Sequence, residues 1–193
     1  MKRLAVYCGS ATPADLRYIE LAADVGRTLA QRGIGVVYGG GRLGLMGAVA
    51  TAALEAGGEV IGVIPEALVS GEVANHDCTE LIVVKDMHER KAAFTRLSDG
   101  FVTIPGGVGT MDELWEAVSW AQLGYHAKPV GLLNALGFFD HLIAFNHHMI
   151  EVGFIRPAHQ GIIIAEPELD LLLTRMAAHE PHQPIFGMKT SDL

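Results

Sequence analysis

Cysteine is scarce in this chain. Its scarcity argues against a small protein held together by disulfide bonds and against one that binds a metal through clustered cysteines. Among the 193 residues there are two cysteines, Cys8 and Cys78. Two thiols are too few for a disulfide framework, and they show no metal-ligand spacing. We therefore expect a protein of the reducing cytoplasm that has no metal site.

Basic residues are also few. The chain has 14 lysines and arginines against 22 acidic residues, which gives a formal net charge of −8 at pH 7. This balance disfavours a protein that coats nucleic acid or an anionic membrane, because both of those partners carry negative charge. It leaves room for one small anionic ligand, so we expect no nucleic-acid partner and no membrane partner.

Long apolar runs are missing as well. The longest uncharged apolar stretch, Pro129–Phe139, is interrupted by two glycines and an asparagine and is too short to span a bilayer. The first residues, Met1–Gly9, are basic and then apolar, like a signal peptide. Their apolar run is short and has no clear cleavage site, so it predicts a first strand rather than a targeting segment.

What the chain has in abundance is apolar residues, which make up 50% of it. That fraction can bury a core in one compact domain. Seven short β-branched runs predict strands: Leu4–Cys8, Ile34–Tyr38, Val60–Ile64, Leu81–Val84, Phe101–Ile104, Val130–Leu133 and Ile162–Ala165. Six segments with helical periodicity predict helices at about Pro13–Gln31, Leu45–Ala56, Met87–Leu97, Thr110–Leu123, Phe138–Val152 and Pro167–Ala178.

Nearly continuous apolar strands that alternate with helices are typical of a parallel sheet covered on both faces. With right-handed crossovers, the pattern predicts an α/β fold: a three-layer, Rossmann-like, doubly wound parallel sheet of about seven strands flanked by helices. Glu66–Thr79 interrupts the alternation as a polar, helix-poor connection between two strands. We expect one domain over residues 1–179 and a loosely ordered C-terminal tail over residues 180–193.

The first of two glycine-rich loops runs from Gly39 to Gly47, between a predicted strand and a predicted helix. Gly39, Gly41 and Gly44 satisfy the G-x-G-x-x-G pattern of dinucleotide-binding folds. Such a site also needs an acid at the end of the next strand to hold the ribose hydroxyls, but Glu59 stands at the beginning of its strand. We therefore favour a loop that lets a ligand approach the backbone closely over an NAD site. Tight packing between strand and helix is the alternative.

The second glycine-rich loop, Pro105–Glu113, follows a predicted strand and opens the next predicted helix. Several exposed N–H groups, the Thr110 hydroxyl and a helix N-terminus converge there, which predicts a phosphate site. The lysine of a Walker loop is missing, so we do not expect a triphosphate bound through Mg²⁺. A glycine-rich turn without a ligand is the alternative.

Glu113 stands in the first turn of the helix predicted over Thr110–Leu123, where the positive helix end favours the ionised carboxylate. A phosphate would repel a carboxylate beside it, so this position suggests that a positively charged transition state forms nearby. Helix capping is the alternative role for Glu113.

Arg90 is the second unusual charge. Asp86 and Glu89 resemble a capping box at the start of its helix, and Arg90 falls on the apolar stripe that includes Met87 and Phe94. A charge on a core-facing stripe needs a partner. The sequence favours an arginine that points into the cleft, toward a phosphate or Glu113, with a surface ion pair as the alternative.

Together these residues resemble the LOG family ("lonely guy", the cytokinin riboside 5′-monophosphate phosphoribohydrolases). The resemblance runs from about Leu4 to Ile164. It rests on these motifs in this order: Cys8-Gly9-Ser10, Gly39-Gly40-Gly41, Gly44-Leu45-Met46-Gly47, Met87-His88-Glu89-Arg90-Lys91, Pro105–Glu113, Trp120–Gly124 and Lys128–Leu133. It implies a Rossmann-like fold and a homodimer.

The resemblance also implies the reaction: hydrolysis of the N-glycosidic bond of AMP, or of an N6-substituted cytokinin nucleotide, to free base and ribose 5-phosphate without a cofactor. Arg90 and Glu113 match the catalytic pair of the family. The implied substrate-binding residues are Ser10, Gly40, Gly41, Glu72, Arg90, Lys91, Gly106, Gly107, Val108, Gly109, Thr110, Glu113 and Ser119. Ser119 and Asp112 stand where plant members often have threonine and a second glutamate, two departures that bear on substrate preference.

Glycoside cleavage passes through an oxocarbenium-like ribosyl centre, and we expect Glu113 to stabilise that charge or to deprotonate the attacking water. Arg90 would orient the phosphate or ribose and fix Glu113. The residue that protonates the leaving base is not identified. His88 is a candidate for this acid, and a surface histidine without such a role is the alternative. We expect His141, His147 and His148, on one predicted helix, at the surface or a subunit interface rather than at a metal.

Three other functions are weighed against hydrolysis. A nucleotide or molybdenum-cofactor carrier of the same fold would not need the Arg90 and Glu113 pair. An NAD-dependent oxidoreductase is disfavoured by the position of Glu59. Sequences of this kind often carry the label lysine decarboxylase-like, but that chemistry needs a Schiff-base lysine for pyridoxal phosphate, and none of the five lysines stands in a recognisable cofactor site.

Overall fold

A computed structural model describes residues 1–69 and 74–186, and its core is one seven-stranded parallel sheet. The strands are β1 (Arg3–Tyr7), β2 (Gly35–Tyr38), β3 (Val60–Pro65), β4 (Glu80–Val84), β5 (Phe101–Thr103), β6 (Val130–Leu133) and β7 (Ile163–Glu166). They lie in the order β4-β3-β2-β1-β5-β6-β7, and every neighbouring pair is parallel. The α/β class and the doubly wound parallel sheet are thus confirmed.

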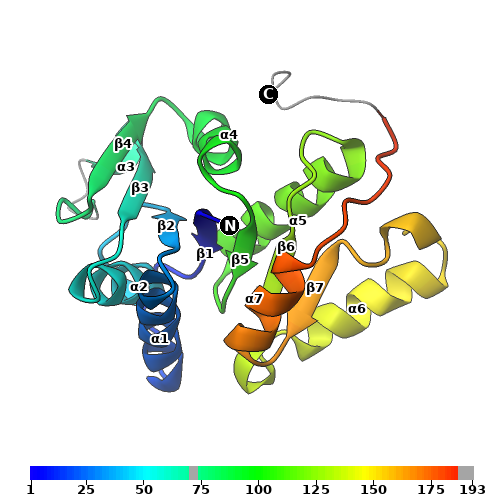
Figure 1. Cartoon of the computed structure of the whole chain (residues 1–193), viewed down its shortest axis with the longest axis horizontal. Coiled ribbons are helices and arrows are strands. Elements are labelled where there is room, and N and C mark those ends of the chain that lie inside the picture. The colour runs from blue at the N-terminus through cyan, green and yellow to red at the C-terminus, as the bar shows by residue number, and fades with distance from the viewer. Residues whose placement is uncertain (70–73, 187–193) are drawn as a thin grey trace.

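Helices cover both faces of the sheet. They are α1 (Arg17–Gln31), α2 (Gly44–Glu55), α3 (Glu66–Val69), α4 (Met87–Leu97), α5 (Val108–Leu123), α6 (Asp140–Glu151) and α7 (Leu169–Ala177). Figure 1 shows α1, α2 and α7 on one side of the sheet and α4, α5 and α6 on the other, and each group packs over its own apolar core. This covering explains why the strands are apolar on both faces.

The order of the strands reverses between β1 and β5. From β1 the chain adds β2, β3 and β4 toward one edge of the sheet, and it then returns to add β5, β6 and β7 toward the other. In an open parallel sheet such a reversal leaves a crevice outside the carboxyl ends of the two central strands. The loops after β1 and β5 meet at this crevice, and a hydrogen bond from the Gly9 N–H to the Pro105 carbonyl joins them (3.1 Å).

The connection Glu66–Thr79 is poor in helix over its described residues, as expected, because α3 occupies only the first four of them. One helix boundary needs correction. The helix after β5 begins at Val108, two residues before the predicted Thr110, because Gly107 has an extended backbone and forms its N-cap. The earlier start moves Glu113 out of the first turn of α5.

The C-terminal segment after α7 contacts the domain over its described part. The Ile185 N–H donates to the Gln122 carbonyl at the end of α5 (2.9 Å), and a ring nitrogen of His159 bonds to the Gln183 carbonyl (2.9 Å). Residues 187–193 lie outside the described residues, so the loosely ordered tail stays a prediction. None of the described helices is long and apolar enough to cross a membrane.

Candidate active site

The crevice at the carboxyl ends of β1 and β5 holds a cavity of about 420 Å³. Its volume is in the range of small-molecule sites, roughly 300–1,000 Å³. The walls come from the loops after β1, β2 and β5, from the end of β3 and from helices α2, α3, α4 and α5: Cys8, Gly9, Ser10, Ala11, Gly39, Gly41, Met46, Ile64, Leu68, Arg90, Gly107, Val108, Gly109, Thr110 and Glu113. Arg90 and Glu113 are the charged side chains that line it, among the residues that the structure describes.

The loop after β5 presents backbone N–H groups to this cavity. Gly107, Val108 and Gly109 are exposed at the N-terminus of α5, while Thr110 is buried beneath them. Among the described residues, none outside the local backbone comes within 4 Å of the position that a Cβ would take at Gly107 or Gly109, whereas a Cβ at Gly106 would lie 2.1 Å from the Thr110 hydroxyl oxygen. Gly106 therefore serves close packing, and the next residues leave open space in front of N–H groups that the first turn of a helix cannot pair internally. This arrangement suits a phosphate.

Arg90 is directed into the cavity by the helix that carries it. The Asp86 side chain accepts a hydrogen bond from the Glu89 N–H (2.9 Å), and the Glu89 carboxylate accepts one from the Lys85 N–H (2.9 Å). This variant of the capping box fixes the start of α4. Arg90, in the first turn, is 6% exposed and points inward, as its place on the apolar stripe predicts.

Contacts with the backbone, a carboxylate and an aromatic ring hold the guanidinium of Arg90, in addition to a long contact from Nη1 to Met87 Sδ (4.0 Å). Its Nε donates to the Val63 carbonyl (3.1 Å) and its Nη1 donates to Glu113 Oε1 (2.9 Å). The group also lies 5.0 Å from the centre of the Phe94 ring, within reach of a cation–π interaction. The predicted pairing of Arg90 with Glu113 is thus present, and the surface ion pair is excluded because the two side chains are 7% and 5% exposed.

Glu113 differs electrostatically from the sequence expectation. It lies in the second turn of α5, so the helix end does not govern its ionisation. Burial raises the pKa of its carboxyl to about 7, and the negative charge of Asp112 adds to the rise, while Arg90 opposes it. The expected preference for the ionised form is wrong: near neutral pH this group is present in both protonation states, as acid–base chemistry requires.

The first glycine loop makes room for Arg90. A Cβ at Gly39 would lie 2.2 Å from Arg90 Nη2 and 2.9 Å from the Met46 methyl carbon. Only glycine fits this position without displacing the guanidinium. Glu59 forms an ion pair with Arg3 (2.7 Å) at the amino end of the sheet, so no acid from this position reaches the cavity to hold a nucleotide ribose. The geometry disfavours the NAD interpretation.

Some expected substrate contacts do not line the cavity. Gly40 packs against β3, and Gly106 borders a smaller apolar pocket beside the phosphate loop. Ser119 is exposed on α5. Lys91 forms ion pairs with Glu116 (2.6 Å) and Asp112 (3.3 Å). Glu72 lies outside the described residues.

Sequence reasoning missed the apolar side chains of the cavity. Met46, Ile64 and Leu68 are among its lining residues, and Leu68 is 48% exposed although it is apolar. Apolar residues at the end of a strand or in a short helix give the same pattern in a core or a pocket, so no sequence signal could have separated them. The exposure of Leu68 beside the cavity distinguishes a pocket residue from a core residue, but this exposure is seen only in the structure.

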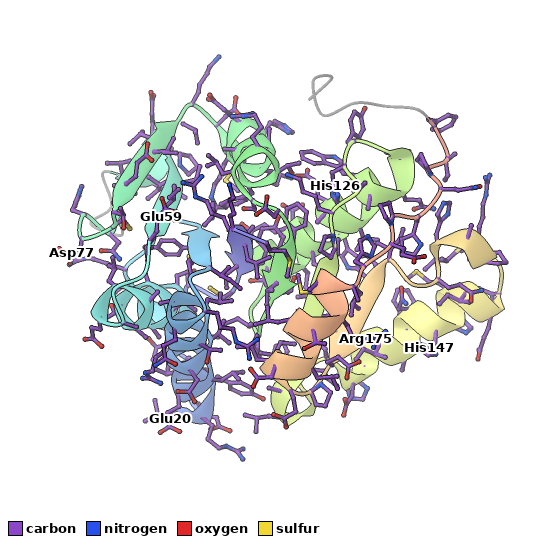
Figure 2. All side chains as sticks on the ribbon, in the orientation of Figure 1. Glu20, Glu59, Asp77, His126, His147 and Arg175 are labelled. Atoms are coloured by element: carbon purple, nitrogen blue, oxygen red, sulfur yellow. The ribbon has the colours of Figure 1, made fainter. Side chains whose placement is uncertain are left out.

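The histidines lie away from this cavity. His88 is exposed on α4, and His141, His147 and His148 are exposed on α6; Figure 2 shows His147 on the outer side of the molecule. Within residues 1–69 and 74–186, no group of three or more histidine, cysteine or acidic residues is arranged to hold a metal ion. Among the described residues, the cavity therefore offers backbone amides, the hydroxyls of Ser10 and Thr110, the Cys8 thiol, one guanidinium and one carboxyl as its chemical groups.

Comparison with known proteins gives three kinds of match. A family model described as "possible lysine decarboxylase" matches residues 46–176. The cytokinin riboside 5′-monophosphate phosphoribohydrolase LOG5 of Arabidopsis thaliana is 44% identical over 180 residues, covering 93% of this chain and 79% of the relative. LOG1 of the same plant, which has the same activity in its name, is 40% identical over 193 residues, covering 100% of this chain and 91% of the relative.

The sheet and its helices also match solved structures. The molybdenum cofactor carrier protein of Chlamydomonas reinhardtii superposes with a TM-score of 0.69 at 22% identity, covering 92% of this chain and 98% of the carrier. At this identity the match supports the Rossmann-like fold alone. Function has to be argued from the site.

Proposed function

The chain belongs to the LOG family, and we propose that it is a phosphoribohydrolase that cleaves the N-glycosidic bond of AMP or of an N6-substituted (cytokinin) riboside 5′-monophosphate. The products are the free base and ribose 5-phosphate. The observation that carries this proposal is the buried pair of Arg90 and Glu113, which faces the same cavity as the phosphate loop. An anion site beside an acid–base group is what hydrolysis of a nucleotide requires.

The phosphate loop would hold the substrate at its 5′ end. The N–H groups of residues 107–110 at the start of α5 would bind the phosphate, assisted by the Thr110 hydroxyl. Binding energy from this group, remote from the bond that breaks, would position the ribose against Glu113. Ser10 and Gly41 line the same cavity and complete the proposed binding set.

Glu113 would act at the anomeric carbon. Its ionised carboxylate stabilises the oxocarbenium-like ribosyl centre or removes a proton from the attacking water. Arg90 holds Glu113 Oε1 and fixes its orientation. With the pKa of Glu113 at about 7, the reactive ionised form grows as pH rises through neutrality.

The base would lie against the apolar side chains of the cavity. Met46, Ile64 and Leu68 line it, and their side chains suit a purine and an apolar N6 substituent. A prenylated nucleotide would bury more apolar surface there than AMP does. The relative values of kcat/KM for AMP and for a prenylated nucleotide show which of the two the protein prefers.

Lysine decarboxylation does not fit this cavity. Pyridoxal-phosphate chemistry needs a lysine that reaches the cofactor. Lys91 is held by two carboxylates, and Lys128 donates to the backbone carbonyls of Thr95 and Ser98. No lysine among the described residues lines the cavity.

A carrier that binds a nucleotide without hydrolysis has no use for a buried carboxyl that ionises near neutral pH.

The expected homodimer and cytoplasmic location stay predictions. The exposed apolar side chains Phe145 on α6 and Phe154 beyond it would suit a dimer interface. Sedimentation of the purified protein tests the dimer.

The direct test is incubation of the purified chain with AMP and with isopentenyl-AMP, followed by chromatography of the bases and of ribose 5-phosphate. We expect both products from the unmodified protein. We expect a loss of kcat of about a hundredfold or more in Glu113→Gln. Glu20→Gln is the matched control, because Glu20 is exposed on α1, lies at the margin of the molecule in Figure 2 and is not among the residues that line the cavity. Full activity in Glu113→Gln would refute the assigned role, and an inactive parent protein would favour the carrier.

A further inference from the structure

Lys91 stands next to Arg90 in the sequence but serves a different part of the molecule. Its side chain is 12% exposed, and its ammonium lies 2.6 Å from a Glu116 carboxylate oxygen and 3.3 Å from one of Asp112. Both acids belong to α5, the helix that carries Glu113. Lys91 therefore joins α4 to α5 and is not among the residues that line the cavity.

The groups around Glu113 carry an unusual concentration of charge. They are Arg90 and Lys91 from α4, Asp112 and Glu116 from α5, and Tyr7 and Cys8 at the end of β1. Burial raises the pKa of both the Tyr7 hydroxyl and the Cys8 thiol, so these two groups are uncharged at neutral pH. The charge near Glu113 is thus set by two cations and two other carboxylates.

Beyond burial, the negative charge of Asp112 raises the pKa of Glu113, while the positive charge of Arg90 lowers it and that of Lys91 adds to the lowering. Lys91 also holds Asp112 and Glu116 in ion pairs, so it offsets the carboxylates that flank Glu113 on α5. Burial by itself would lower the pKa of its ammonium, but the hydrogen bonds and charges of Glu116 and Asp112 outweigh burial and raise it. Lys91 consequently keeps its positive charge across the pH range in which Glu113 titrates.

We propose that Lys91 is a positioning residue, which offsets the charge of Asp112 and Glu116 and thereby sets the pH at which Glu113 becomes reactive. The kinetic part of this inference rests on the proposed hydrolase function. It differs from a substrate-binding role in a measurable way. A phosphate ligand would change KM at every pH, whereas an electrostatic neighbour changes the pH profile.

Three variants test the proposal. Two of them should shift the titration of Glu113 in opposite directions, and the third should leave it unchanged. Lys91→Met removes the compensating cation and should move the titration of Glu113 to higher pH, by about half a unit or more. Asp112→Asn removes one opposing carboxylate and should move it to lower pH. Lys91→Arg keeps the charge and should restore the parent titration. Asp112 is 55% exposed, so its variant should fold even if Lys91→Met does not.

The first readout needs no activity. Carbon-13 spectra of protein labelled at glutamate side-chain carboxyls, with the Glu113 signal assigned by its loss in Glu113→Gln, give the titration of this group directly. The second readout is the pH dependence of kcat/KM for AMP. The limb of this profile is the pH range over which activity rises as Glu113 ionises, and in each variant it should move in the same direction as the carbon-13 titration.

The proposal is supported if the titration of Glu113 shifts in opposite directions in Lys91→Met and Asp112→Asn. In both variants KM should stay within about threefold of the parent value at pH values where Glu113 is fully ionised. A Glu113 titration that does not move in either variant overturns it, as does a rise in KM at all pH values with an unmoved limb. If the parent protein fails to hydrolyse either nucleotide, the proposed function fails, and the carbon-13 titrations still decide the electrostatic inference.

Discussion

Replacing Glu113 by glutamine should make the protein more stable at alkaline pH while it abolishes hydrolysis. The carboxyl is 5% exposed, and its pKa in the folded protein is raised from 4.5 to about 7, chiefly by burial. The folded state therefore binds more protons than the unfolded chain between these two values. The stability that this group contributes is present below pH 4.5 and is lost as pH rises through about 7.

The size of the effect follows from the shift. Each pKa unit corresponds to about 1.4 kcal/mol, so the whole shift corresponds to about 3 kcal/mol. Of this, about 2.5 kcal/mol is lost between pH 5 and pH 8.5. Glutamine resembles the protonated carboxyl and cannot ionise, so the variant escapes this loss. Its Oε1 can still accept a hydrogen bond from Arg90, which limits any constant difference between the two proteins.

The assay is urea unfolding, followed by circular dichroism, of the parent protein and Glu113→Gln between pH 5 and pH 8.5. The quantity of interest is the difference in unfolding free energy between the two proteins, because titrations of other groups cancel in it. We expect the difference to grow by about 2.5 kcal/mol in favour of the variant as pH rises. Glu20→Gln, at an exposed site, should show no such trend. A constant difference for Glu113→Gln would refute the burial argument, whatever the activity of the variant.

Two further substitutions test other parts of the structure. Gly39→Ala places a methyl group 2.2 Å from Arg90 Nη2, so we expect at least a tenfold fall in kcat/KM with the fold retained by circular dichroism; unchanged kinetics would show that the guanidinium has room to move. His126→Gln should flatten the acid side of the stability curve. The buried His126 ring bonds through Nε2 to the Ala117 carbonyl (2.9 Å) and accepts from the Lys128 N–H (3.2 Å), and burial lowers its pKa to about 4 from 6.5. Its contribution is therefore present above pH 6.5 and is lost as pH falls toward 4, by about 2 kcal/mol between pH 7 and pH 5. Equal acid sensitivity in urea titrations of both proteins would contradict this.

Local pattern was sufficient for the sheet and for the loops that carry the chemistry. Each strand was predicted within one or two residues of its observed bounds, because a buried parallel strand is a short apolar run whatever surrounds it. The loop Pro105–Glu113 could be predicted as a phosphate site because the N–H groups that form it come from consecutive residues. Arg90 could be recognised as unusual because a charge on an apolar stripe violates the helical pattern.

Helix ends were less predictable, and one of them mattered for the site. Thr110 is a good N-cap residue, but the chain caps α5 at Gly107 because its extended backbone lets the helix start earlier. The difference of two residues moved Glu113 from the first turn to the second. An argument from the helix dipole that was sound for the first turn then no longer applied.

Local pattern was enough to predict the fold class, the two glycine loops and the two unusual charges, Arg90 and Glu113. How acidic Glu113 is, which apolar side chains line the cavity, and that Lys91 pairs with α5 rather than lining the cavity depend on packing. The reason is physical. Periodicity and turn chemistry are properties of neighbouring residues, whereas the pKa of a buried carboxyl depends on how much water and which charges α4, α5 and β1 leave around it once they pack.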